Sequence, residues 1–226
     1  MRLYYNRRHW KHKIFQKYAS FRLISCTIIA VQSWNITTDF AFAWFQRVEY
    51  IQSSWSQYID TWFKPTWNSE IEFDFETISW TPTWLFGVDS NWTVNAFSVF
   101  TDRVFCYWNQ YIWNWSTIYF TPWTKYKLEF KSLKCYLNSS LQYTFSSRSF
   151  TSSYSAYLFA KRRNNTIEMY AKEKVYWLKL RDNWELVRDM YPVYRKSDNV
   201  IWMLDIKNKV FYTNNWSWSF TKWPNV

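Results

Sequence analysis

The stretch EIEFDFETI, residues 70–78, alternates acidic and apolar side chains over most of its length. Successive side chains of an extended strand point to opposite faces, so Ile71, Phe73 and Phe75 would share one face and the acids the other. This alternation is typical of a half-exposed strand whose apolar face covers a core. It is the first indication of an all-β protein.

Other strand-like segments, rich in aromatic and β-branched residues, occur on both sides of this stretch. They are QYID (57–60), AFSVF (96–100), TIYF (117–120), KYKLEF (125–130), SAYLFA (155–160), IEMYAKEKVYWLKL (167–180), ELVRDMYPVY (185–194), VIWMLDI (200–206) and KVFYT (209–213). Turn-forming clusters separate them at roughly the spacing of a β-sandwich or jelly roll. We expect one two-layer β domain over residues 47–226, preceded by a short linker at 34–46. The Ser-rich stretch 139–155 fits either a loop or a polar-faced strand pair.

Tryptophan and glycine occur at unusual frequencies. The chain has 19 tryptophans and one glycine, Gly87, whereas a typical chain of this length has roughly 16 glycines. Many tryptophans follow Ser, Thr, Asn or Pro, as in Asn183-Trp184 and Asn215-Trp216, where glycine is the usual turn partner. We interpret most of them as UGA codons that the source organism reads as glycine. The alternative is a tryptophan-rich protein with stacking platforms for sugars or bases.

The N-terminal 33 residues are basic and end in a short apolar run, LISCTIIAV (23–31). Such a segment is typical of a secretory signal peptide, and its apolar run is too short to span a bilayer as a helix. We therefore expect a secreted or cell-surface protein with no membrane span in the mature chain. The segment carries Arg2, Arg7, Arg8, Lys11, Lys13, Lys17 and Arg22 and no acid, so its removal lowers the net charge from +11 to 11 − 7 = +4. The remaining charge does not favour a nucleic-acid partner.

Cysteine and histidine limit the chemistry that the mature chain can perform. Removal of the leader takes away Cys26 and leaves Cys106 and Cys135, which could form a disulfide or remain two buried thiols. Both histidines, His9 and His12, lie in the leader, so neither a histidine-based catalytic site nor a histidine metal site is expected. The sequence indicates no cofactor and leaves calcium and the oligomeric state open.

Two segments resemble a known module when tryptophan is read as glycine. VEYIQSSWSQYIDTWFKP (48–65) is similar to EYIQSSGTQYIDTGFKP, and the ending DNWELVRDMYPVYRKSDNVIWMLDIKNKVFYTNNWSWSFTKW (182–223) is similar to that module's close. The module is a concanavalin A-like, laminin-G-like domain of bacterial surface and phage tail-associated proteins. The resemblance implies a jelly-roll sandwich of two antiparallel sheets with a binding or structural role. Its pattern has glycine at Trp55, Trp62, Trp184, Trp202, Trp216, Trp218 and Trp223.

The strongest catalytic candidates are Glu72, Asp74 and Glu76, which strand alternation places on one face. Some glycoside hydrolases of the concanavalin-like sandwich carry a Glu-x-Asp-x-Glu strand, and two carboxyls are the groups that glycoside hydrolysis needs. The same residues also fit the polar face of an ordinary half-exposed strand. A structural role is expected for Arg188, Asp189 and Arg195, which could tie the sheets together through charge-assisted hydrogen bonds.

We therefore expect a non-enzymatic domain that binds a glycan or a surface protein, in the manner of a lectin. Tyr107, Asn109 and Tyr111 form the nearest approach to an aromatic and polar cluster for stacking on a sugar, although a packed turn explains them more simply. A glycoside hydrolase that uses Glu72, Asp74 and Glu76 and a purely structural phage-tail or surface-layer module are the alternatives.

Overall fold

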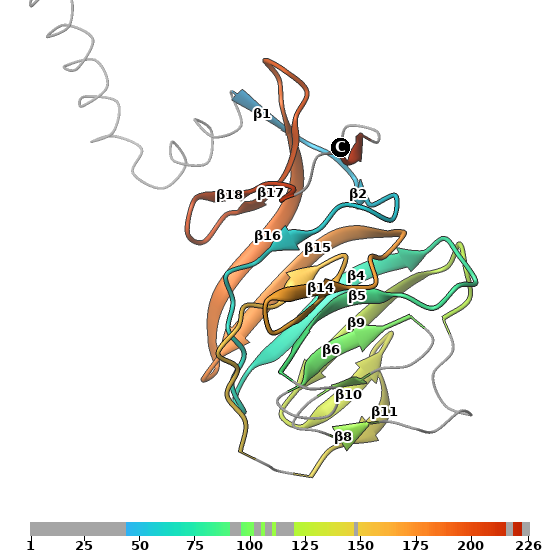
Figure 1. The fold of residues 1–226 in the computed structure, drawn as a ribbon, viewed down its shortest axis with the longest axis vertical. Helices are drawn as coiled ribbons and strands as arrows, with labels where there is room; N and C mark the ends of the chain where they lie inside the picture. Colours follow the sequence, from blue (N-terminus) through green and yellow to red (C-terminus); the bar gives the residue numbers. More distant parts are fainter. Residues whose placement is uncertain are drawn as a thin grey trace, which may run out of the picture. The chain divides into compact units, whose positions relative to one another are not determined.

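The computed structural model describes residues 44–90, 96–101, 105–106, 110–111, 120–146, 149–215 and 219–222. From Phe45 onward these ranges belong to one compact unit. Their regular structure consists of short strands in two main sheets and one separate pair. The prediction of an all-β chain is confirmed (Figure 1).

The larger sheet has 11 strands in the order β11-β10-β9-β4-β15-β16-β17-β18, with β1 added to β16, β2 to β15 and β19 to β2. All of its pairs are antiparallel. Its strands are β1 (Phe45–Arg47), β2 (Ile51–Gln52), β4 (Glu70–Thr77), β9 (Lys125–Lys131), β10 (Lys134–Leu137), β11 (Ser140–Thr144), β15 (Glu173–Asp182), β16 (Glu185–Arg195), β17 (Ile201–Asp205), β18 (Val210–Tyr212) and β19 (Thr221–Lys222).

The smaller sheet has six strands in the order β14-β13-β5-β12-β3, with β6 also paired to β5. Only β13 and β5 run parallel among its described pairs. Its strands are β3 (Ile59–Asp60), β5 (Trp84–Asp89), β6 (Phe97–Phe100), β12 (Tyr157–Leu158), β13 (Lys161–Arg163) and β14 (Thr166–Glu168). The separate pair is β7 (Phe105–Cys106) and β8 (Gln110–Tyr111).

The two main sheets form a β-sandwich, with the smaller sheet in front of the larger one in Figure 1. Apolar side chains from both layers are buried in one cluster, among them Phe73 and Leu178 of the larger sheet and Phe86 and Leu158 of the smaller. Strand β4 shows the predicted alternation, because Phe73 and Phe75 are fully buried while Asp74 between them is only partly covered.

Most predicted strands are present, although several are shorter or divided. The long segment 167–180 separates into β14 and β15, and the Ser-rich stretch contains the polar strand β11. The strands that were not predicted are β1, β2, β5, β7, β8, β10, β13 and β19. Strand β5 is buried along its whole length, so it lacks the alternation of a half-exposed strand. In the segment 117–120, residues 117–119 lie outside the described ranges and Phe120 lies outside any strand.

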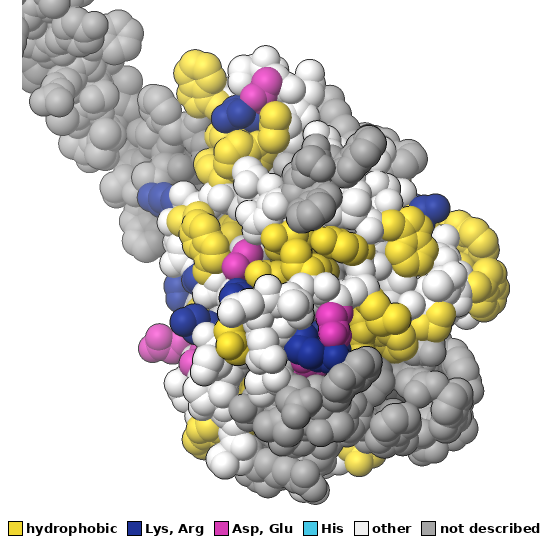
Figure 2. Space-filling view, in the orientation of Figure 1, with side chains coloured by type: hydrophobic (Ala, Val, Ile, Leu, Met, Phe, Trp, Pro, Cys, Tyr) yellow, Lys and Arg dark blue, Asp and Glu magenta, His cyan; other side chains and the backbone are white. Residues whose placement is uncertain are grey.

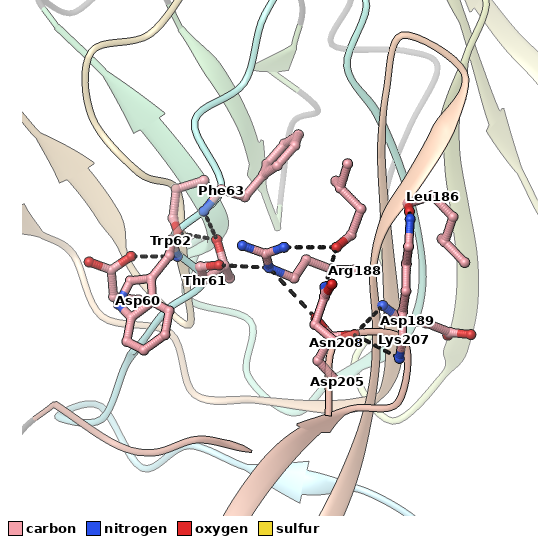
Figure 3. A network of polar contacts seen from close by, with 12 residues as sticks. Asp60, Thr61, Trp62, Phe63, Leu186, Arg188, Asp189, Asp205, Lys207 and Asn208 are labelled. Atoms are coloured by element: carbon pink, nitrogen blue, oxygen red, sulfur yellow. Dashed lines mark hydrogen bonds and ion pairs between the residues drawn. The ribbon is translucent and has the colours of Figure 1, made fainter. Parts of the chain in front are cut away.

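Arg188 ties the two sheets together, as the sequence predicts (Figure 3). From β16 of the larger sheet its Nε donates to the carbonyl of Thr61, directly after β3 of the smaller sheet, at 3.4 Å. The same Nε lies 3.7 Å from Oδ2 of the buried Asp205. Asp205 Oδ1 accepts the backbone N–H groups of Asp189, Lys207 and Asn208, which holds the β17–β18 turn against β16.

Arg195 does not tie the sheets, which corrects the prediction for this residue. It pairs with Asp198 in the turn between β16 and β17, and its guanidinium lies 5.0 Å from the centroid of the Trp202 ring. Asp189 takes part in the tie through its backbone N–H, whereas burial raises the pKa of its carboxyl. Arg195 therefore acts within its own hairpin.

Several turns pass through the left-handed region of backbone conformation. Trp55, Trp62, Trp123 and Trp184 have φ values of 83°, 53°, 61° and 71°. Asn183 and Trp184 form the two-residue loop between β15 and β16, and both have positive φ. This is the geometry of a type I′ hairpin, for which Asn-Gly is a preferred pair. A bulky side chain is strained in this region, because its Cβ approaches the following carbonyl oxygen.

We predict that Trp184→Gly raises the free energy of unfolding, by about 1 kcal/mol, because it removes the left-handed strain at an exposed site. Trp177→Gly is the matched control, since Trp177 lies half-buried within β15 and is not among the positive-φ residues. The control should lower stability through lost packing and a more flexible unfolded chain. Urea denaturation midpoints of the three proteins provide the measurement, and equal destabilisation by both substitutions would contradict the assignment of strain.

Glu173 is a fully buried carboxyl at the start of β15. Its Oε1 accepts the hydroxyl of Thr83 at 3.1 Å, and its Oε2 accepts the backbone N–H of Ile78 at 3.1 Å. It therefore holds both ends of the β4–β5 connection. Burial raises the pKa of this carboxyl from 4.5 to about 8, against the lowering effect of these hydrogen bonds.

This raised pKa makes stability depend on pH. The folded protein keeps its proton on Glu173 up to about pH 8, whereas the unfolded chain loses it near 4.5. The free energy of unfolding should therefore fall as pH rises through this window, by about 1.4 kcal/mol per pH unit from this one group. Denaturation midpoints of the native protein and of Glu173→Gln between pH 5 and pH 9 test the effect. The variant should show a flatter pH dependence, and identical slopes would refute the assignment.

Candidate functional site

The predicted carboxylates lie together on the outer face of the larger sheet, and each is paired with a cation. Glu72 lies 2.8 Å from Lys127 and 3.3 Å from Arg181. Asp74 lies 3.3 Å from Lys125. These contacts come from β9 and β15, the two strands on either side of β4. The alternation prediction is therefore correct for the shared face, and the carboxylates belong to a network of ion pairs.

Glu76 is held by two partners of β15. Lys174 Nζ donates to Oε1 at 2.7 Å, and the Tyr176 hydroxyl donates to Oε2 at 2.7 Å. Burial would raise the pKa of Glu72, but the hydrogen bonds and charges of Lys127 and Arg181 outweigh it and lower that pKa. A lowered pKa does not suit a general acid, which must hold its proton near neutral pH.

The aromatic rings on this outer face are covered by cations. Lys125 lies 3.9 Å from the centroid of the Tyr176 ring, and Lys174 lies 4.7 Å from that of Tyr50. A register shift in β15 next to Tyr176 brings Trp177 to the same face, where Lys127 and Lys179 approach its ring. Tyr50 and Tyr176 are only 7% and 8% exposed. These rings offer little free surface for stacking on a ligand.

A small hollow of about 180 Å³ lies at one end of this face. Its walls include Glu72, Glu129, Arg181 and Trp184. It is smaller than typical ligand pockets of about 300–1,000 Å³. One wall is Trp184, whose backbone conformation favours glycine, so the shape of the hollow depends on the residue that fits its position least well. We therefore do not place the functional site here.

Four half-buried tyrosines gather beside the smaller sheet and form what we call the tyrosine cluster: Tyr58, Tyr154, Tyr157 and Tyr170. The ring of Tyr58 lies 4.8 Å from that of Tyr157 and 6.2 Å from that of Tyr170, between centroids. Tyr157 belongs to β12, and the other three come from separate connecting segments. Figure 2, in which tyrosine has the same colour as the other hydrophobic side chains, shows several groups of hydrophobic side chains on the face where β5 and β14 lie in front.

Arg162 of β13 joins the tyrosines into one patch. Its guanidinium carbon lies 5.0 Å from the centroid of the Tyr154 ring and 5.3 Å from that of Tyr157. Its Nη1 donates to Ser155 Oγ at 2.9 Å and lies 3.7 Å from Asp60 Oδ2. Its Nε donates to the carbonyl of Asn164 at 2.8 Å, which fixes the plane of the group.

The patch has unused hydrogen-bond donors. Within the described part of the chain, neither the four tyrosine hydroxyls nor Arg162 Nη2 makes a hydrogen bond. Burial raises the pKa values of Tyr58, Tyr157 and Tyr170, so these hydroxyls keep their protons at neutral pH. The half-buried rings, next to free donors, can contact both the apolar and the polar surface of a ligand.

The other predicted site residues lie elsewhere or outside the described ranges. Tyr107 and Asn109 are not described, and Tyr111 lies in β8 without a described side chain. Cys135 is a free, fully buried thiol rather than half of a disulfide with Cys106, and burial raises its pKa to about 12. A thiol with such a pKa stays protonated and unreactive.

The sequence did not identify the tyrosine cluster, because its members come from four separated segments. The motif SSYSAY (152–157) contains Tyr154 and Tyr157 and carries the only local signal. Spacing alone cannot show that Tyr58, about a hundred residues earlier, directly precedes a strand that pairs with the one carrying Tyr157. This proximity follows from the antiparallel pairing of β3 with β12.

Comparisons with known proteins identify no relative. No protein-family model, curated protein or solved structure matches the chain. Among the described residues, no helix has the length and apolar character needed to cross a membrane. The same residues contain no group of three or more His, Cys, Asp or Glu side chains placed to hold a metal ion.

Proposed function

We propose that this protein is a non-enzymatic, secreted or surface-displayed binding domain of the concanavalin A-like, laminin-G-like jelly-roll type, and that it binds glycans through the tyrosine cluster. The observation that carries the proposal is the contiguous patch of Tyr58, Tyr154, Tyr157 and Tyr170 beside Arg162. Tyrosine rings can pack against the C–H faces of sugars while their hydroxyls donate to sugar oxygens.

We favour binding over hydrolysis because the candidate catalytic carboxylates are already paired with cations. Glu72, Asp74 and Glu76 each have a lysine or arginine partner. Beside the tyrosine cluster, the carboxylate of Asp60 faces Arg162. Hydrolysis by the usual route needs two carboxyls on opposite sides of the scissile bond. The cluster offers stacking surface and donors, which suit recognition of a ligand.

The tyrosine cluster is also independent of the tryptophan question. Its members are tyrosines and an arginine, so they are the same residues whether UGA is read as tryptophan or as glycine. The outer face of the larger sheet lacks this independence, since it includes Trp177 and Trp184. A binding function at the tyrosine cluster therefore does not depend on whether UGA is read as tryptophan or as glycine.

A glycan array followed by calorimetry on the best saccharide tests the proposal. Tyr157→Ala and Tyr58→Ala should each weaken binding by about tenfold, because each removes a ring from the stacking surface. Tyr143→Ala is the matched control, since this tyrosine is 37% exposed on β11 of the other sheet. Circular dichroism and denaturation midpoints establish that the variants are folded, and Tyr157→Phe keeps the ring and should retain most of the affinity.

Two outcomes would overturn the proposal. The first is a folded native protein that binds no saccharide, and stable self-association in that case would favour a structural module of a tail or surface layer. The second is a saccharide ligand whose affinity is the same for the native protein and for both tyrosine-to-alanine variants. Cleavage of a polysaccharide that Glu72→Gln and Glu76→Gln abolish would favour the hydrolase instead.

A further inference from the structure

The balance of donors and acceptors in the tyrosine cluster points to the class of sugar. Its acceptors are occupied: Asp60 Oδ1 accepts the backbone N–H of Trp62 at 2.8 Å, and its Oδ2 faces Arg162. Asn214 Oδ1 accepts the backbone N–H of Tyr58 at 3.2 Å. The groups left over are the tyrosine hydroxyls and Arg162 Nη2, all of which can donate.

We propose that the tyrosine cluster, if it binds glycans as inferred above, selects sugars that carry an anionic acceptor group, a uronate carboxylate or a sulfate ester. The tyrosine hydroxyls can donate as well as accept, and Arg162 Nη2 can only donate, so the patch can match a group that only accepts. The guanidinium is the side chain best suited to carboxylate and sulfate oxygens, because its N–H groups lie in one plane.

The position of Arg162 prepares it for this role. Contacts with the rings of Tyr154 and Tyr157 and hydrogen bonds to Ser155 and Asn164 fix the guanidinium before any ligand arrives. A fixed group loses little conformational entropy on binding, which favours affinity. The neighbouring Asp60 partly offsets the positive charge, so recognition rests on directed N–H donors rather than on a broad positive field.

Calorimetry with three matched oligosaccharides tests the proposal: an oligogalacturonate, a sulfated galactan oligomer and a neutral galacto-oligosaccharide. The native protein should bind at least one acidic oligomer about tenfold more tightly than the neutral one, and added salt should weaken that preference. Arg162→Gln should weaken binding of the acidic oligomer more than binding of the neutral one, and so remove the preference. Arg181→Gln, on the outer face of the other sheet, should change neither.

The outcomes separate this inference from the proposed function. Equal or tighter binding of the neutral oligomer overturns acidic selectivity and leaves glycan binding in place. Retention of the preference in folded Arg162→Gln also overturns it. Failure of all saccharides, neutral and acidic, refutes the glycan-binding proposal itself. Whether the uronate or the sulfated oligomer binds more tightly then identifies the anionic group.

A second inference rests on backbone geometry and concerns the native residue at the tryptophan positions. We propose that Trp55, Trp62, Trp123 and Trp184 are glycine in the protein as its source organism makes it. All four have left-handed φ values, and all four are more than a third exposed, so no burial offsets the strain. Trp184 also occupies the second position of a two-residue hairpin after Asn183, where glycine is preferred.

Gly87, the one glycine in the sequence, is required for a different reason from the four turn positions. Gly87 lies in β5 without a positive φ, and a Cβ built there would come within 2.4 Å of the Cβ of Ser98. It is therefore required for space in the core, whereas the four turn positions require glycine for conformation. Other residues, such as Leu133, also adopt positive φ in this fold. The four tryptophans are distinguished by their combination of positive φ, exposure and turn position in a chain with a single glycine.

Peptide mass spectrometry on protein isolated from its source tests the second inference. Trypsin should release residues 182–188, DNWELVR, because arginine precedes and ends this peptide. The two readings differ in mass by a whole indole side chain at position 184. The glycine mass is expected, and the tryptophan mass alone would refute the inference.

Discussion

This sandwich depends on tight turns whose residues adopt the left-handed backbone conformation. Three hairpins of the larger sheet close in two residues, at 132–133, 138–139 and 183–184, and each of these residues has a positive φ. Such turns match the right-handed twist of their strands and fix the pairing register. A slip of one residue in these hairpins would reverse the faces of β9 or β15, exposing apolar side chains and burying charged ones. The core and the polar outer face are therefore consequences of turn geometry.

The same geometry bears on where we propose that binding occurs. On the outer face of the larger sheet, the register places carboxylates next to lysines and arginines, so these charges are paired, although Asp74 Oδ1 accepts no hydrogen bond. Beside the smaller sheet, β3 and β12 pair at an edge, and connecting segments bring further tyrosines to them. At that edge, tyrosine rings and hydrogen-bond donors lie together, and some of these donors have no hydrogen-bond partner among the described residues. We therefore propose that binding occurs beside the smaller sheet, where rings and hydrogen-bond donors lie together.

The sequence alone predicted the features that depend on residues close together in the chain. Alternation identified β4, and the sequence of the C-terminal segment indicated β16, β17, β18 and the sheet-to-sheet role of Arg188. Features with a non-local cause were missed. Strand β5 is buried throughout and shows no alternation, Arg195 pairs within its own turn, and the tyrosine cluster unites residues from distant segments. The shared face of Glu72 and Asp74 was predicted, but their cationic partners depend on neighbouring strands that spacing cannot reveal.

The central claim is that ligand binding belongs to the tyrosine cluster and not to the exposed tryptophans. The most direct test is the affinity of one saccharide for two chains, the present one and one in which Trp55, Trp62, Trp67, Trp80, Trp123 and Trp184 are all glycine. The account predicts the same dissociation constant and stoichiometry for both chains, because no ring of the tyrosine cluster changes. Loss of binding in the folded glycine chain would contradict it and would place recognition on the tryptophans.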